Sequence, residues 1–151
     1  MIEHEILHVI GRDSVVGIFG DQNYPNLLCG KSVKERKEVA TKFKRLIMVL
    51  RPKLVYIMPT LGINRFLLPL LKTLDIKYVI VNPYRGCFEP ESTKEKIPLL
   101  IGLENCNSVI TISGPPSKEY GEGKILLESR DFIIDRSNIV LSIFGSRPST
   151  D

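Results

Sequence analysis

The sequence predicts an α/β protein with a doubly wound, mostly parallel sheet of about five strands and helices on both faces. Short apolar runs alternate with amphipathic segments at least four times along the 151 residues, as in chains built from strand–helix–strand units. Each apolar run also ends in a polar or glycine-bearing turn, as buried strands do. The length suits a single domain over residues 1–151.

The amino-terminal third predicts one strand and the clearest helix. Residues 2–10 form a short strand or a helical turn, and the apolar residues 15–19 form the first parallel strand, with Gly20 opening the loop after it. Ser32-Val33-Lys34-Glu35 matches a capping box, whose side chains bond the free amides at a helix start. Apolar residues then recur at spacings of three and four up to Pro52, so we expect an amphipathic helix that stops before this proline.

The central segment predicts a second strand, a tight turn and a second helix. The apolar residues 54–58 form the strand and turn abruptly at Pro59-Thr60-Leu61-Gly62, and a Leu- and Phe-rich helix follows over about 64–74. Pro69 is awkward inside that helix, so either the helix begins later or it bends there.

A third strand and a third helix follow. The strand covers 78–81 and stops at Asn82-Pro83, where a loop begins. Ser92-Thr93-Lys94-Glu95 matches a second capping box, although Pro98 argues for a later helix start. The apolar residues beyond this proline still need burial, so the helix ends near Asn105.

The last part of the chain predicts two strands with a helix between them. The strands cover 108–112 and 139–144, and the helix buries an apolar face over 125–133. Between the first of these strands and the helix, residues 113–123 are rich in glycine and proline, which is typical of a mobile flap over the strand ends.

All the strand ends of a parallel sheet meet at one edge, where open α/β folds bind ligands. Several small residues there, facing helix amino termini, can hold an anion through backbone amides and the helix dipole. The candidate ligand-binding residues are Gly20, Asp21, Gln22, Thr60, Leu61, Gly62, Ile63, Asn64, Asn82, Pro83, Tyr84, Ser113, Gly114, Tyr120, Arg130, Gly145, Ser146 and Arg147.

Within this set, the turn at residues 60–64 is the best candidate for phosphate contact, although its glycine would equally serve a tight turn alone. Tyr84 and Tyr120 could stack a base or act as plain lids. Arg130 and Arg147 could pair with phosphate through two hydrogen bonds each, or lie on the surface.

Composition sets outer limits on function. The chain carries 21 Lys+Arg against 17 Asp+Glu, a formal charge of +4, which permits an anionic partner without requiring one. The three cysteines form no CxxC pair, so the sequence predicts no metal site and no cofactor, and reduced thiols favour a cytoplasmic protein. No apolar run approaches the length of about 20 residues that a membrane helix needs, so no membrane partner is expected.

The segments IFGDQN, MPTLGIN, NPY and RDFIIDRSNIVLSIFGS form a pattern that covers residues 15–145. This pattern resembles the SLOG superfamily, the Rossmann-like domains of Smf/DprA proteins and Lonely-Guy (LOG) nucleotide hydrolases, and most closely its small stand-alone branch. The positions that match the family pattern are Gly20, Gly62, Pro83, Arg130, Ser137 and Gly145. The resemblance implies a nucleotide-derived ligand at the strand ends, commonly in a homodimer.

The departures from this family bear on catalysis. Asn64 stands where the family turn often has a carboxylate, Ser137-Asn138 replaces a Ser-Asp pair, and the signature of LOG hydrolases is absent. Cleavage of an N-glycosidic bond develops positive charge on the sugar, which a nearby carboxylate stabilises. The remaining acids near the expected site are Asp21, Glu119 and Glu122, of which Asp21 is the best placed as a catalytic residue.

Three functions remain open. The first is capture or sensing of a nucleotide-derived molecule without strong catalysis. The second is a nucleoside 5′-phosphate N-glycosidase, a hydrolase with Asp21 as its acid. The third is a single-stranded nucleic-acid binder that uses the basic helix over residues 34–51, although such a helix face is more often simply solvated.

Overall fold

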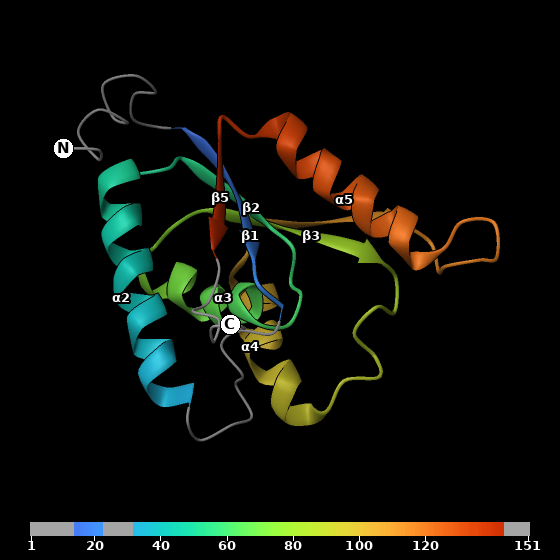
Figure 1. Cartoon of the computed structure of the whole chain (residues 1–151), viewed down its shortest axis with the longest axis horizontal. Helices are drawn as coiled ribbons and strands as arrows, with labels where there is room; N and C mark the ends of the chain where they lie inside the picture. Colours follow the sequence, from blue (N-terminus) through green and yellow to red (C-terminus); the bar gives the residue numbers. More distant parts are fainter. Residues whose placement is uncertain (1–13, 23–31, 144–151) are drawn as a thin grey trace, which may run out of the picture.

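The computed structural model describes residues 14–22 and 32–143. The predicted segment at residues 2–10 and the candidate residues Gly145, Ser146 and Arg147 lie outside these ranges, as does the side chain of Ser32. Five strands and four helices alternate through the described residues (Figure 1). They are β1 (Val15–Gly20), α2 (Ser32–Leu50), β2 (Leu54–Ile57), α3 (Ile63–Thr73), β3 (Tyr78–Tyr84), α4 (Thr93–Asn105), β4 (Ser108–Ser113), α5 (Glu122–Arg136) and β5 (Ile139–Ile143).

The strands form one parallel sheet in the order β4-β3-β2-β1-β5, which confirms the predicted fold class. From β1 to β4 each new strand is added on the same side of the previous one. The chain then returns and places β5 against the free edge of β1, with Val16 opposite Ile139. The direction of winding therefore reverses between β1 and β5.

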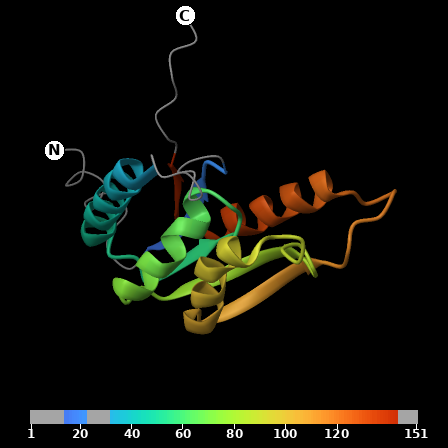
Figure 2. The ribbon, with the colours of Figure 1, turned by 90° about the horizontal axis from the view of Figure 1, so that it is seen from below.

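The helices divide between the two faces of the sheet (Figure 2). Helices α2, α3 and α4 cover one face, where their apolar side chains and alternate strand residues such as Ile18 and Ile57 form the larger core. On the other face α5 contributes Ile133 to a smaller cluster with Met58 and Val81. Gly17 lets α5 come close, because a Cβ there would lie 2.6 Å from Ile133 Cγ2.

The third strand extends further than the sequence predicts. Instead of stopping at Asn82-Pro83, β3 runs on to Tyr84. The carbonyl of Lys77 accepts a hydrogen bond from Val55 in β2, and that of Tyr78 accepts one from Asn107 just before β4, so alternate residues face opposite neighbours. The backbone nitrogen of Pro83 points to the same side as the Lys77 carbonyl. On that side β2 has already ended at Ile57. The missing N–H of Pro83 therefore costs no ladder hydrogen bond.

The two late helix starts suggested by proline are also wrong. Helix α3 begins at Ile63 with Pro69 inside it, and α4 begins at Thr93 with Pro98 inside it. An interior proline removes one backbone hydrogen bond, but other contacts fix where each helix starts. For α4 this contact is the predicted capping box, in which the Ser92 hydroxyl accepts from the Glu95 N–H and the Glu95 carboxylate accepts from the Ser92 N–H.

A buried arginine, which the sequence did not single out, ties three of these elements together. Arg65 in α3 has no exposed surface. Its guanidinium donates to the carbonyl of Pro59 after β2, to both carboxylate oxygens of Glu91 in the β3–α4 loop, and to the carbonyl of Glu95 in α4. The ring of Phe88 lies 5.2 Å from the guanidinium carbon. This network fixes the turn after β2 relative to the start of α4.

Candidate functional site

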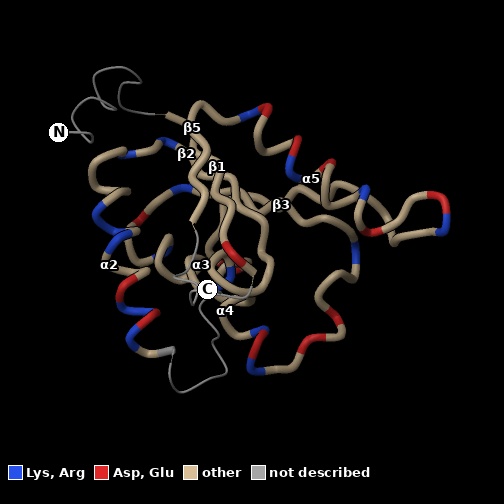
Figure 3. Tube along the Cα trace, viewed as in Figure 1, with Lys and Arg blue, Asp and Glu red and all other residues tan. Residues whose placement is uncertain are grey.

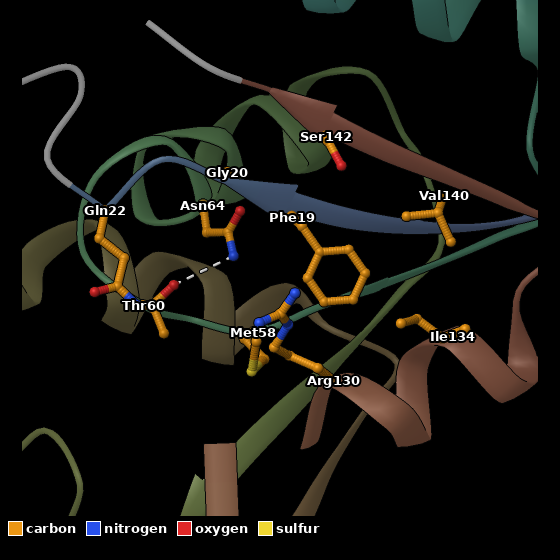
Figure 4. A pocket seen from close by; sticks show the side chains of 10 residues that line it. All are labelled: Phe19, Gly20, Gln22, Met58, Thr60, Asn64, Arg130, Ile134, Val140 and Ser142. Carbon is orange, nitrogen blue, oxygen red and sulfur yellow. Dashed lines mark hydrogen bonds between the residues drawn. The ribbon is translucent and has the colours of Figure 1, made fainter. Parts of the chain in front are cut away.

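A cavity of about 430 Å³ opens at the carboxyl ends of β1, β2 and β5, on the face that α5 covers (Figure 4). The cavity lies beside the boundary between β1 and β5, where the direction of winding reverses. Crevices at such switch points are the usual ligand sites of open α/β sheets. The lining residues are Phe19, Gly20, Gln22, Met58, Thr60, Asn64, Arg130, Ile134, Val140 and Ser142.

One side of the cavity is apolar. Phe19 and Met58 come from the ends of β1 and β2, and Ile134 comes from α5. Val140 in β5 pairs with Gly17, so its side chain also points to the α5 face of the sheet. Ile134 and Val140 remain 46% and 42% exposed, which leaves apolar surface available to a bound molecule.

The amide of Asn64 forms the polar end of the cavity. The residue is only 2% exposed, and its Nδ2 donates to Thr60 Oγ1 at 3.2 Å (Figure 4). Its Oδ1 is buried and has no hydrogen-bond partner among the described residues. An acceptor left in this state costs about 1–3 kcal/mol. This oxygen lies against Gly20, so a ligand that donates an N–H or O–H would recover this free energy only if the Asn64 side chain turned toward the cavity.

The backbone of the turn before α3 is held by the end of β1. Gly62 has a φ of +87°, and a Cβ at this position would overlap the carbonyl oxygens of Asp21 and Gln22. The N–H of Ile63 donates to the Asp21 carbonyl at 3.0 Å, and the N–H of Arg65 donates to the Thr60 carbonyl. The close approach of this backbone and the positive φ therefore explain why glycine occupies position 62, without a contact to phosphate. Two of the first amides of α3 are already bonded to protein.

Arg130 supplies positive charge from the opposite wall. Its exposed side chain extends from α5, and its guanidinium carbon lies 5.9 Å from the centre of the Phe19 ring (Figure 4). Among the described lining residues Arg130 carries the single positive charge, and none carries a carboxylate. The cavity is therefore suited to a molecule with an anionic group and an apolar or aromatic part.

The structure brings together five of the predicted site residues and separates others. Gly20, Gln22, Thr60, Asn64 and Arg130 line the cavity. The remaining described candidates are not lining residues: Asp21, Leu61, Gly62, Ile63, Asn82, Pro83, Tyr84, Ser113, Gly114 and Tyr120. The loop expected to act as a flap projects beyond the end of β4 (Figure 1), and no residue of it lines the cavity.

The two candidate tyrosines contact acidic side chains instead. The Tyr84 hydroxyl donates to Glu122 at 3.2 Å. A hydrogen bond with Cys87, burial and the nearby Glu122 carboxylate hold the pKa of Tyr84 above its usual value. A hydrogen bond with Glu128 raises the pKa of Tyr120 in the same direction. Both rings are therefore neutral at physiological pH and already have partners on the protein.

Sequence reasoning missed half of the lining, namely Phe19, Met58, Ile134, Val140 and Ser142. A usable signal was present in the strand alternation. Phe19 and Ser142 are register partners and point to the same face, while Ile18 between Gly17 and Phe19 points into the larger core. Without the strand order, this alternation does not show which of the two faces of the sheet is left open beside a helix.

The basic helix α2 lies on the opposite face of the sheet from the cavity. Exposed Lys34, Lys37, Lys44 and Arg45 are interspersed with Glu35 and Glu38, and Figure 3 shows both signs of charge along this helix. Mixed charge of this kind is typical of a solvated helix face.

Within residues 14–22 and 32–143, no three His, Cys, Asp or Glu side chains come together to hold a metal ion. None of the described helices has the length and apolar character required to cross a bilayer. The chain matches no protein-family model, and the search of curated proteins gave no match. The fold and the cavity define a Rossmann-like α/β protein with a ligand-sized crevice at its switch point.

Proposed function

We propose that this protein binds a nucleotide-derived small molecule in the cavity at the ends of β1, β2 and β5, as a sensor or sequestering protein. The observation that carries the proposal is the buried Asn64 amide, which lines a crevice together with Arg130 and keeps one acceptor without a partner among the described residues. The cavity volume, about 430 Å³, falls in the usual range of small-molecule sites, roughly 300–1,000 Å³.

The two polar ends give the ligand a direction. The unpartnered Asn64 oxygen is an acceptor, so a ligand group that reaches it must donate a hydrogen bond, as a ribose hydroxyl or a base N–H does. The phosphate belongs at Arg130, which can form a charge-assisted pair with it. Phe19 and Met58 lie between these ends and offer an apolar surface to a base.

Binding without turnover is preferred over N-glycosidic hydrolysis. That reaction needs a carboxylate beside the sugar, and the described lining contains none. Asp21 is adjacent in sequence to the lining residues Gly20 and Gln22, and its backbone carbonyl is bonded to Ile63. Release of free base by the wild-type protein, abolished in Asp21→Asn, would establish the hydrolase instead.

Calorimetry tests the proposal directly. The wild-type protein is titrated with a panel of mononucleotides, cyclic dinucleotides and ADP-ribose derivatives, and at least one should give saturable heat. Arg130→Gln should weaken that binding by roughly 10- to 100-fold, as expected for a lost hydrogen bond to a charged group. Absence of heat with every compound would refute the proposal.

A matched control is available on the same helix. Arg136 in the last turn of α5 stacks on Phe132, with its guanidinium carbon 3.5 Å from the ring centre, and it does not line the cavity. Arg136→Gln removes the same charge and should leave the affinity unchanged. An equal loss in both variants would indicate general attraction to positive charge rather than a site at Arg130.

The alternative ligand is a single-stranded nucleic acid. Its binding would weaken steeply as salt is added and would depend on the basic residues of α2.

A further inference from the structure

Helix α4 is apolar on the side that faces away from the protein. Ile97, Leu100 and Leu103 follow one another at intervals of three residues and are 52%, 59% and 38% exposed. The inner side is apolar as well, because Leu99 is buried and Gly102 packs against Leu68 of α3, where a Cβ would lie 2.8 Å from Leu68 Cδ1. A helix that is hydrophobic on all sides is normally buried on all sides.

The outer faces of α2 and α5 carry charged residues. Helix α2 presents Lys34, Lys37 and Lys44 to solvent, and α5 presents Asp131 and Asp135. Both are ordinary amphipathic surface helices with a wet outer face. Exposed apolar residues on these helices, such as Met48 and Leu127, stand among charged residues, whereas those of α4 follow one another along one side of the helix.

The edge strand β4 also exposes an apolar side chain on this face of the sheet. Val109 in β4 pairs with Ile80 of β3, so the two side chains point to the same face of the sheet, the one that α3 and α4 cover. Ile80 is fully buried, whereas Val109 is 45% exposed. We call the surface formed by Ile97, Leu100 and Leu103 the α4 surface.

We propose that the α4 surface binds the same surface of a second copy of this chain, with the two α4 helices antiparallel about a two-fold axis at Leu100. The charges on the helix favour this occupant. Lys96 lies four residues before Leu100 and Glu104 lies four residues after it. Antiparallel pairing about Leu100 brings Lys96 of each copy level with Glu104 of the other, and Ile97 level with Leu103.

The alternative pairing of the same helices is unfavourable. Parallel α4 helices would place Lys96 level with Lys96 and would also align the two helix dipoles. Antiparallel pairing opposes the dipoles and joins unlike charges, so the sequence of α4 is complementary to itself. The α4 surface lies on the face of the sheet opposite α5, so both cavities would stay open in the dimer (Figure 2). The dimer does not depend on the proposed ligand.

Sedimentation equilibrium with point variants tests the surface. We expect wild-type protein to be a dimer at about 100 µM, a concentration at which even weak homodimers form. Leu100→Glu should convert it to a monomer. The control is Leu127→Glu on α5, where Leu127 is equally exposed at 56% and should tolerate the same change without loss of the dimer. A monomeric wild type, or a dimer that survives Leu100→Glu, would overturn the proposal.

Charge reversal tests the antiparallel register. Lys96→Glu and Glu104→Lys should each weaken the dimer by roughly 10-fold, because each creates two like-charge contacts. An equimolar mixture of the two variants should regain wild-type affinity, since the mixed dimer pairs unlike charges at both positions. Lys96 also donates to the Glu89 carbonyl at 3.0 Å, so circular dichroism must confirm that each variant is folded. Folded variants whose mixture stays as weak as either alone would exclude this arrangement.

Discussion

Arg65 and Glu91 form a two-point ion pair inside the protein, with Nη1–Oε1 at 2.7 Å and Nη2–Oε2 at 3.0 Å. The Arg65 side chain is fully buried and that of Glu91 is 13% exposed. Because Nε and Nη2 also donate to the Pro59 carbonyl, the charge is held in a closed set of hydrogen bonds. Truncation of either partner leaves the other charge buried without compensation.

We therefore expect Arg65→Met to lower the free energy of unfolding by about 3–5 kcal/mol, because it strands the Glu91 carboxylate. The double variant with Glu91→Gln should recover part of this loss, since no net charge is then left behind. Urea denaturation measures both. Arg85→Met, at an exposed arginine of the same β3–α4 connection, is the control and should change little. A cost below about 1 kcal/mol for Arg65→Met would mean that the network contributes little.

Two glycine substitutions should have opposite signs. Gly62→Ala forces a side chain into the backbone of Asp21 and Gln22 at a positive φ, so it should cost more than about 1 kcal/mol and separate the end of β1 from α3. Gly123→Ala, in the first turn of α5 with no atom within 4 Å of its Cβ, should stabilise the protein by up to about 1 kcal/mol. Thermal unfolding of the two variants gives the comparison, and equal effects would contradict it.

Asn64→Leu should separate ligand binding from folding. The change removes the unpartnered Oδ1, which costs about 1–3 kcal/mol, together with one hydrogen bond to Thr60 worth about 1 kcal/mol. We expect unchanged or slightly higher stability in urea and loss of nucleotide binding in calorimetry. A variant that binds normally would remove Asn64 from the site, and a variant destabilised by more than about 2 kcal/mol would assign it a structural role.

Stability at high pH should depend on Tyr78. Burial raises the pKa of Tyr78 from 10.0 to about 12, and its hydroxyl donates to the Gly102 carbonyl at 2.6 Å. The unfolded chain loses this proton first, so the stabilisation is complete below pH 10 and declines as the pH rises from 10 to about 12. The decline should reach about 1.4 kcal/mol per pH unit in the wild type and should be absent when the stability of Tyr78→Phe is followed over the same pH range. If urea denaturation gave the same change with pH in the free energy of unfolding for both proteins, this prediction would be wrong.

The sequence was sufficient to predict the elements and their parallel arrangement, because local patterns determine them. The capping box at Ser92 marks the start of α4 as its sequence predicts, and its contacts outweigh the cost of Pro98 inside the helix. The extension of β3 through Pro83 depends on where β2 ends, and no local pattern contains that information. Half of the cavity lining was out of reach for the same reason, since the roles of Phe19 and Val140 follow from the strand order.

The division of helices between the two faces has a consequence for how this fold can diversify. The larger core lies under α2, α3 and α4, and the crevice lies on the side that α5 covers. Residues of α5 such as Ile134 and Arg130 can therefore be exchanged without disturbing the packing that holds the sheet together. A designer who wished to admit a bulkier or differently charged guest would alter this one helix and leave the other three as they are.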